Sequence, residues 1–174
     1  MFTAESKVYV AISPQSLSSL AYFCGLKTKE DTVRRLRHFL RTKLGVEDVY
    51  GLEHFNQIAL DLSFLEFKER FRASAKADPE KMAKIKKSLK WNRDVGHLPI
   101  LTSECPGWVC YAEKTIGTDA FPFMSKIKSP QQLCGKILKL HQLLQANETK
   151  QVKFVTIMPC YDKKLEAVRP KISL

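Results

Sequence analysis

Runs of apolar and β-branched residues recur along the chain, and four of them predict β-strands. KVYVAIS at 7–13 alternates in polarity and is rich in β-branched and aromatic residues, which favours a half-buried or central strand. VEDVYGL at 46–52 is a candidate second strand, and LPILTSE at 98–104 is a third. VKFVTIMP at 152–159 has the strongest strand pattern of the four.

Segments with helical periodicity follow the first strand. Ser13 can cap a short helix in which Pro14 is the first residue, and Gly25 ends that helix. A capping box that begins at Thr28 opens a second, amphipathic helix over 28–45.

Three further helical segments occupy the rest of the chain. Residues 58–90 carry a long helical pattern that we expect to break near Asp78 and Pro79. Another helix opens near Pro106, and an amphipathic helix starts at Ser129.

The alternation of strands and helices predicts an α/β fold, a parallel sheet with flanking helices. A length of 174 residues, 44% of them hydrophobic, suits one domain with a real core. We therefore assign residues 1–174 to a single α/β domain.

The formal net charge of +11 favours acidic partners such as RNA, DNA or an acidic protein face. Nine basic residues and two acidic ones lie between Arg70 and Arg93. This stretch fits either a basic helix for nucleic acid or a solvated face on a helix whose Met82, Ile85 and Leu89 pack inward. We favour the solvated face, because no aromatic platform or known nucleic-acid motif accompanies the charges. We therefore expect no nucleic-acid partner.

The five cysteines have no regular short spacing, and no hydrophobic signal segment opens the chain, so a reducing compartment is predicted. No apolar run approaches the roughly 20 residues that would cross a bilayer. We expect a soluble intracellular protein without a membrane partner. The four histidines show no metal spacing, and no phosphate-binding glycine motif occurs.

Two stretches share one plan: an apolar run, then a cysteine beside a proline, then helical sequence. Cys105 occupies this position in PILTSECPGW, and Cys160 in VTIMPCYDKKLEA. If both runs are parallel strands of one sheet, both thiols lie at its carboxyl edge, where such sheets bind ligands. A helix amino terminus offers N–H groups to a thiolate, and Lys163 and Lys164 add positive charge, which together suit an anionic iron–sulfur cluster. Spacing alone leaves open that each cysteine is a small buried hydrophobe.

Several motifs resemble those of the iron-only hydrogenase family. TSECPGW and MPCYDKKLEA resemble its first two signature motifs, and SPQQ resembles the segment between them. VYVAISPQSLSSLA resembles the family's strand and Ser-Pro helix entry. The nearest resemblance is to the eukaryotic hydrogenase-like branch, the nuclear prelamin A recognition factor-like proteins of cytosolic iron–sulfur assembly. Together the matches span most of residues 7–169.

The resemblance implies that Cys105 and Cys160 are two of the four thiolate ligands of a [4Fe–4S] cluster. In the family, the other two ligands come from a later Cys-rich and Gly-rich motif, and cysteines ahead of the first strand hold a further cluster. Neither segment occurs in this chain. We therefore expect a half-site only, in a chain truncated at both ends, with residues 171–174 as a divergent tail. Cys24, Cys110 and Cys134 are not expected to be ligands.

Two positions bear on chemistry. Hydrogen-evolving members carry a proton-relay cysteine immediately before the ligand cysteine, where this chain has Glu104, so the resemblance implies an assembly protein and not an enzyme. Lys163 matches a family lysine that contacts a diatomic ligand of the di-iron site. We assign Lys163 to cofactor binding, with charge balance as its role.

The resulting prediction is a cytosolic iron–sulfur assembly protein, cytoplasmic or nuclear, that docks with assembly scaffold and targeting proteins. Two alternatives remain: a fragment of a true iron hydrogenase, or a cluster-free interaction module of the lamin-tail-binding type.

Overall fold

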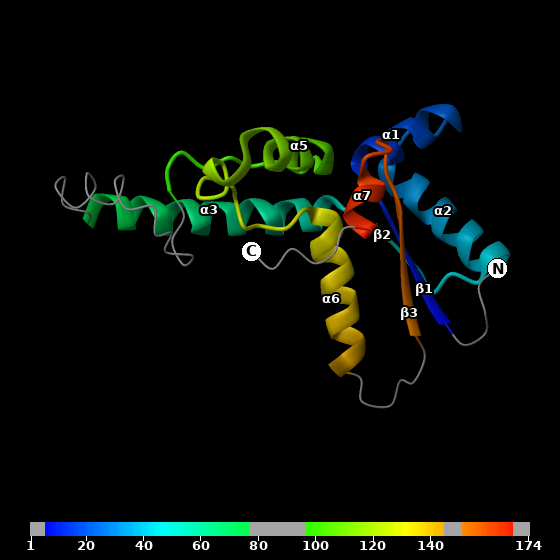
Figure 1. The fold of residues 1–174 in the computed structure, drawn as a ribbon. Coiled ribbons are helices and arrows are strands. Elements are labelled where there is room, and N and C mark those ends of the chain that lie inside the picture. Colours follow the sequence, from blue (N-terminus) through cyan, green and yellow to red (C-terminus); the bar gives the residue numbers. More distant parts are fainter. Residues whose placement is uncertain (1–5, 77–96, 145–150, 169–174) are drawn as a thin grey trace. The chain divides into compact units, whose positions relative to one another are not determined.

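A computed structural model describes residues 6–76, 97–144 and 151–168 (Figure 1). The chain divides into two compact units. The first, called the sheet unit, comprises Met1–Gln57 and Ser129–Tyr161, and the second, called the helical unit, comprises Ile58–Lys128 and Asp162–Leu174. The assignment of 1–174 to a single domain stays a prediction, and residues 171–174 lie outside the described ranges.

A parallel three-stranded sheet forms the centre of the sheet unit, in the order β2-β1-β3. The strands are β1 (Ser6–Ile12), β2 (Asp48–Gly51) and β3 (Gln151–Ile157). In register, Val10 of β1 lies opposite Val49 on one side and Val155 on the other. The predicted α/β class with a parallel sheet is confirmed, and three of the four predicted strands are present.

Helices cover both faces of this sheet (Figure 1). On one face, α2 (Lys29–Leu44) packs Leu40 against Val8 and Val10 of β1 and Val49 of β2. On the other face, α6 (Pro130–Leu144) packs Cys134 against Ala11 of β1. The alternation of side chains along β1 therefore feeds two separate cores.

The predicted helix starts in this unit are also confirmed. Ser13 caps α1 (Pro14–Phe23) by accepting the N–H of Ser16, and Thr28 caps α2 by accepting that of Asp31. Gly45 ends α2 with φ of 67°, a left-handed conformation that favours glycine.

The main helix of the helical unit is α3 (Glu53–Lys76). Its residues from 58 onward belong to this unit. Among the described residues this unit also has four short helices: α5 (Pro106–Tyr111), a π-helical turn η1 (Ala112–Ile116), a 3-10 turn η2 (Gly117–Asp119) and α7 (Lys163–Val168). No helix in the described ranges is long and apolar enough to cross a membrane.

The predicted strand at 98–104 is wrong. Leu101 forms only an isolated bridge with Met124. Its N–H donates to Phe123 O at 2.8 Å, and its carbonyl accepts Ser125 N–H at 2.8 Å, so its main chain pairs with the nearby 123–125 segment. Pro99 has no N–H to add to a ladder. The apolar side chains of this run thus reflect local packing and not membership of the sheet.

The basic stretch that begins at Arg70 is also revised where the structure describes it. Arg70 is buried, with 3% of its side chain exposed, and so does not lie on a solvated face. Arg72 is exposed. Met82, Ile85, Leu89 and the remaining charges up to Arg93 lie outside the described residues, as does the predicted helix break near Asp78 and Pro79.

Candidate metal centre

Cys105 is the amino-terminal cap of α5, as its position before Pro106 predicted. Its Sγ accepts the N–H of Trp108 at 3.5 Å, and its own N–H donates to Ser103 Oγ at 3.1 Å. Pro106 fixes its φ near the helical value and has no N–H that would need a partner at this position. Cys105 is exposed, so its sulfur is accessible from solvent while it accepts one backbone N–H, that of Trp108.

The alternative that Cys105 is a buried hydrophobe is therefore excluded. The predicted position of Cys105 at the carboxyl edge of the sheet is nevertheless wrong, because the run before Cys105 does not belong to the sheet. What brings Cys105 to a helix end is the local turn of Ser103 and Pro106, and not the carboxyl edge of a strand.

Helix α7 approaches the first turn of α5 closely. A Cβ built on Gly107 would lie 2.7 Å from Asp162 Oδ2, well inside a normal contact. Glycine at this position leaves room for the Asp162 carboxylate beside the Cys105 turn.

Lys163 extends this approach to the residue before the thiol. Its Nζ donates to the backbone carbonyl of Glu104 at 2.5 Å and pairs with Glu166 Oε1 at 3.1 Å. Only 12% of the Lys163 side chain is exposed, and 7% of that of Glu166. The structure therefore brings the predicted residues Cys105 and Lys163 together, with a cation held next to the thiol-bearing turn.

Cys160 follows β3 by three residues and is exposed. It belongs to the sheet unit, whereas Cys105 belongs to the helical unit. The convergence of Cys105 and Cys160 on one ligand stays a prediction.

The other cysteines occupy different environments. Cys134 is fully buried between α6 and the sheet, and burial raises the pKa of its thiol to about 12. It stays protonated near neutral pH and is a core residue. Cys24 caps the carboxyl end of α1 and is exposed, whereas Cys110 is half-buried in α5.

The chemistry of the donors fits an iron–sulfur cluster, since exposed thiols, a backbone N–H and a held lysine favour a thiolate-ligated anion. Within the described ranges, no group of three or more His, Cys, Asp or Glu side chains could hold a metal ion. The assignment of Cys105 and Cys160 as metal ligands stays a prediction.

Sequence reasoning missed the supporting residues Ser103, Asp162 and Glu166. Lys163 and Glu166 have the i,i+3 spacing of a helical ion pair, which was a usable signal. The contact between Asp162 and Gly107 joins residues distant in sequence, and no local pattern indicates it.

Comparison with known proteins identifies the family. The sequence profile described as iron only hydrogenase large subunit, C-terminal domain matches residues 6–174. The chain belongs to this family.

Two relatives are similar to this chain over nearly its whole length. A Xenopus tropicalis protein named cytosolic Fe-S cluster assembly factor narfl is 42% identical over 94% of this chain and 30% of its own length. Protein NAR1 of Arabidopsis thaliana is 39% identical over 93% of this chain and 31% of its own length. The chain thus spans about a third of the length of these relatives.

The fold is likewise that of solved hydrogenases. A variant of the [FeFe]-hydrogenase HydA1 from Chlamydomonas reinhardtii superposes with a TM-score of 0.71 at 26% identity, covering 93% of this chain and 35% of the hydrogenase chain. The predicted resemblance to the iron-only hydrogenase family is confirmed.

Proposed function

We propose that this chain is an iron–sulfur protein of the cytosolic iron–sulfur assembly route, without hydrogenase activity. Cys105 and Cys160 would serve as two thiolate ligands of a [4Fe–4S] cluster, with the remaining ligands supplied from outside the chain. The observation that carries the proposal is the Cys105 turn: an exposed thiol that caps α5 beside Lys163. Family membership and the names of the relatives support the pathway.

The residues around Cys105 have distinct tasks in this proposal. Trp108 donates its backbone N–H to the Cys105 sulfur and so stabilises a thiolate ligand. Lys163 balances the negative charge of the cluster from its position on the Glu104 carbonyl. The bound group supplies iron and sulfide for transfer to an acceptor, and the exposure of both cysteines leaves such an acceptor room to approach.

Assembly scaffold and targeting proteins are the proposed partners, in the cytoplasm, and a lamin-tail-like protein in the nucleus is a further one. The basic net charge favours acidic docking faces on any of them.

The ligand assignment can be tested on this chain by anaerobic reconstitution with ferrous iron and sulfide. Dithiothreitol is added, because a small thiol can complete the four-thiolate set. We expect Cys105→Ala and Cys160→Ala each to lose at least half of the bound iron and sulfide. Cys24→Ala is the matched control, since Cys24 is also exposed but caps the carboxyl end of α1. Equal cluster content in Cys160→Ala and wild type would sink the assignment.

A hydrogenase is the second candidate, favoured by the similarity to solved [FeFe]-hydrogenases. Glu104 stands where that chemistry uses a cysteine, so we expect no hydrogen-dependent dye reduction after maturation with the di-iron site. Turnover above that of a Cys105→Ala sample would contradict the non-enzymatic proposal. A cluster-free interaction module would instead remain colourless on reconstitution and bind its partner equally well in Cys105→Ala.

A further inference from the structure

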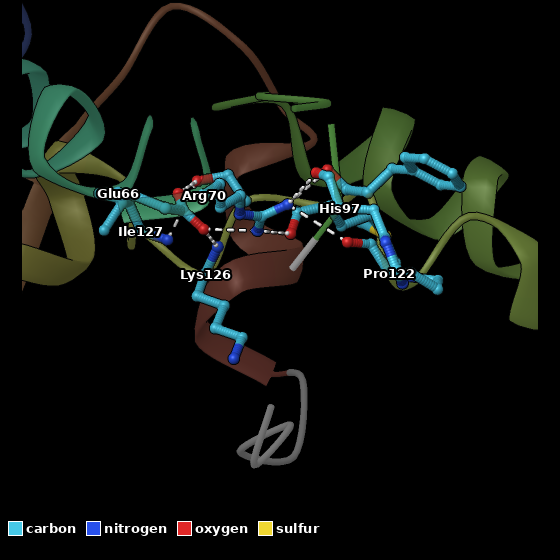
Figure 2. A network of polar contacts seen from close by, with 9 residues as sticks. Glu66, Arg70, His97, Pro122, Lys126 and Ile127 are labelled. Atoms are coloured by element: carbon cyan, nitrogen blue, oxygen red, sulfur yellow. Dashed lines mark hydrogen bonds and ion pairs between the residues drawn. The ribbon is translucent and has the colours of Figure 1, made fainter. Parts of the chain in front are cut away.

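A buried ion pair on α3 organises the main chain of the helical unit (Figure 2). Arg70 and Glu66 pair at 2.5 Å with 3% and 11% of their side chains exposed. Two charges this deeply buried are costly unless their remaining donors and acceptors are satisfied. Their other partners therefore show what the pair holds in place.

The Arg70 guanidinium is surrounded by backbone carbonyls from two segments. Nη1 donates to His97 O at 2.9 Å, to Pro122 O at 3.2 Å and to Phe123 O at 3.4 Å. Nη2 donates to Met124 O at 2.7 Å. A planar guanidinium with five N–H donors can serve several carbonyls at once, which a lysine ammonium cannot match in geometry.

The Glu66 carboxylate binds the two residues that follow Met124 in the sequence, Ser125 and Lys126 (Figure 2). Oε2 accepts the Ser125 hydroxyl at 2.6 Å, and Oε1 accepts the Lys126 N–H at 3.1 Å. The pair thus holds an unbroken run, 122–126, by its carbonyls on one side and its donors on the other.

This held run is the support for the segment that leads to Cys105. His97 N–H donates to Pro122 O at 2.8 Å, and Leu101 exchanges hydrogen bonds with Phe123 and Ser125. Four residues after Leu101, the Ser103 turn places Cys105 at the start of α5. Every contact in this sequence of residues lies within the helical unit.

We infer that Arg70, with Glu66, is the positioning residue for the Cys105 thiol. The pair fixes 122–126, that run fixes 97–101, and the chain then enters the Cys105 turn with its direction set. The inference rests on the proposed role of Cys105 as a ligand. It gives Arg70, the first residue of the basic stretch 70–93, a supporting role at the site in place of the predicted solvated position.

The test measures alkylation by iodoacetamide at each cysteine of the full chain without metal, resolved by peptide mass spectrometry. In Arg70→Ala we expect the rate at Cys105 to change about threefold or more, because local opening alters both the access of the reagent to its sulfur and the sulfur's contact with the Trp108 backbone N–H. Cys24 should react as in wild type. Cys134, which is fully buried, should remain protected and so reports that the sheet unit is folded.

Two controls separate positioning from general loss of structure. Arg72→Ala removes an exposed arginine two residues along the same helix and should leave Cys105 at the wild-type rate. Millimolar methylguanidinium, which can fill the space left in Arg70→Ala, should return the Cys105 rate toward the wild-type value, whereas equimolar sodium chloride should not. Rescue by the missing chemical group is not expected from a chain that has merely lost its fold.

A wild-type rate at Cys105 in folded Arg70→Ala overturns the inference. If Arg70→Ala exposes Cys134, the deciding variant is Glu66→Gln, which removes the charge and keeps the size. A Cys105 rate changed about threefold or more, with Cys134 protected, then supports the inference, and any other result for Glu66→Gln overturns it. Because no metal is present, these outcomes are independent of the reconstitution result that tests the proposed function.

Discussion

Two cysteines of this chain show how position decides the chemistry of one residue type. Cys105 is an exposed helix cap whose sulfur accepts a backbone N–H, whereas Cys134 is packed without exposure beneath the sheet. Apolar surroundings disfavour the thiolate, which is why the pKa of Cys134 is raised. The first is suited to bind a ligand, and the second contributes to the core.

The raised pKa of Cys134 predicts a specific dependence of stability on pH. Its pKa rises from 9.0 to about 12 in the folded chain, so the unfolded chain releases a proton first as pH increases. The stability contribution is fully present below pH 9.0 and is lost as pH rises toward 12. Urea unfolding should show a fall in the free energy of unfolding over this range.

Cys134→Ala provides the comparison for this prediction. The variant removes the titrating group, so its free energy of unfolding should decline less steeply with pH than that of wild type. The matched variant Cys24→Ala removes an exposed thiol and should keep the wild-type slope. Parallel slopes in wild type and Cys134→Ala would contradict the account.

Helix α2 shows which elements sequence alone can define. Thr28 accepts the N–H of Asp31 at 3.1 Å, and Gly45 takes the left-handed conformation at the other end. Both ends depend on side chains within a few residues of the helix terminus, so local sequence is sufficient to predict them.

Loss of the cap should weaken α2 measurably. We expect Thr28→Ala to lower the free energy of unfolding by about 1 kcal/mol, since an orphan N–H at the helix start loses its acceptor. The control is Thr42→Ala, an exposed threonine within the same helix. If both variants unfold at the same urea concentration, the cap of α2 contributes nothing.

The elements that sequence did not predict depend on distant partners. LPILTSE has a strand-like composition, but Leu101 pairs with 123–125 and the Arg70 guanidinium occupies the neighbouring carbonyls. The candidate site divides in the same way. The helix cap at Cys105 followed from the adjacent Pro106. The contacts of Lys163 with Glu104 and of Asp162 with Gly107 instead join residues that are more than 50 positions apart in the sequence. Local patterns carry no information about such pairs.

At the scale of the whole molecule, each unit exposes apolar side chains. In the helical unit, α3 presents Leu60, Phe64 and Phe71 with 64%, 62% and 56% of their surface exposed. In the sheet unit, β3 presents Val155 and Ile157 at 39% and 37%. Exposed apolar groups of this density favour association, against which the net charge of +11 acts.

We expect the chain to self-associate at high protein concentration, with an average mass above 19.9 kDa by light scattering. The double change Phe64→Glu with Phe71→Glu should lower that mass toward the monomer value, because it removes apolar surface from α3. Arg72→Glu adds a carboxylate to the same helix without removing apolar surface, and it should not lower the mass. A wild-type chain that is monomeric at every concentration would show the exposed residues to be harmless.

The order of strands in the sheet also sets the order in which the chain can fold. Central β1 pairs with β2 soon after it in sequence, yet its other edge pairs Ser6 with Gln151. During synthesis from the amino terminus, β1, β2 and α2 can pack early, while the edge of β1 waits until β3 has left the ribosome. The emerging chain therefore carries an open sheet edge while the residues between β2 and β3 are translated, and this is the interval in which a chaperone would be of most use.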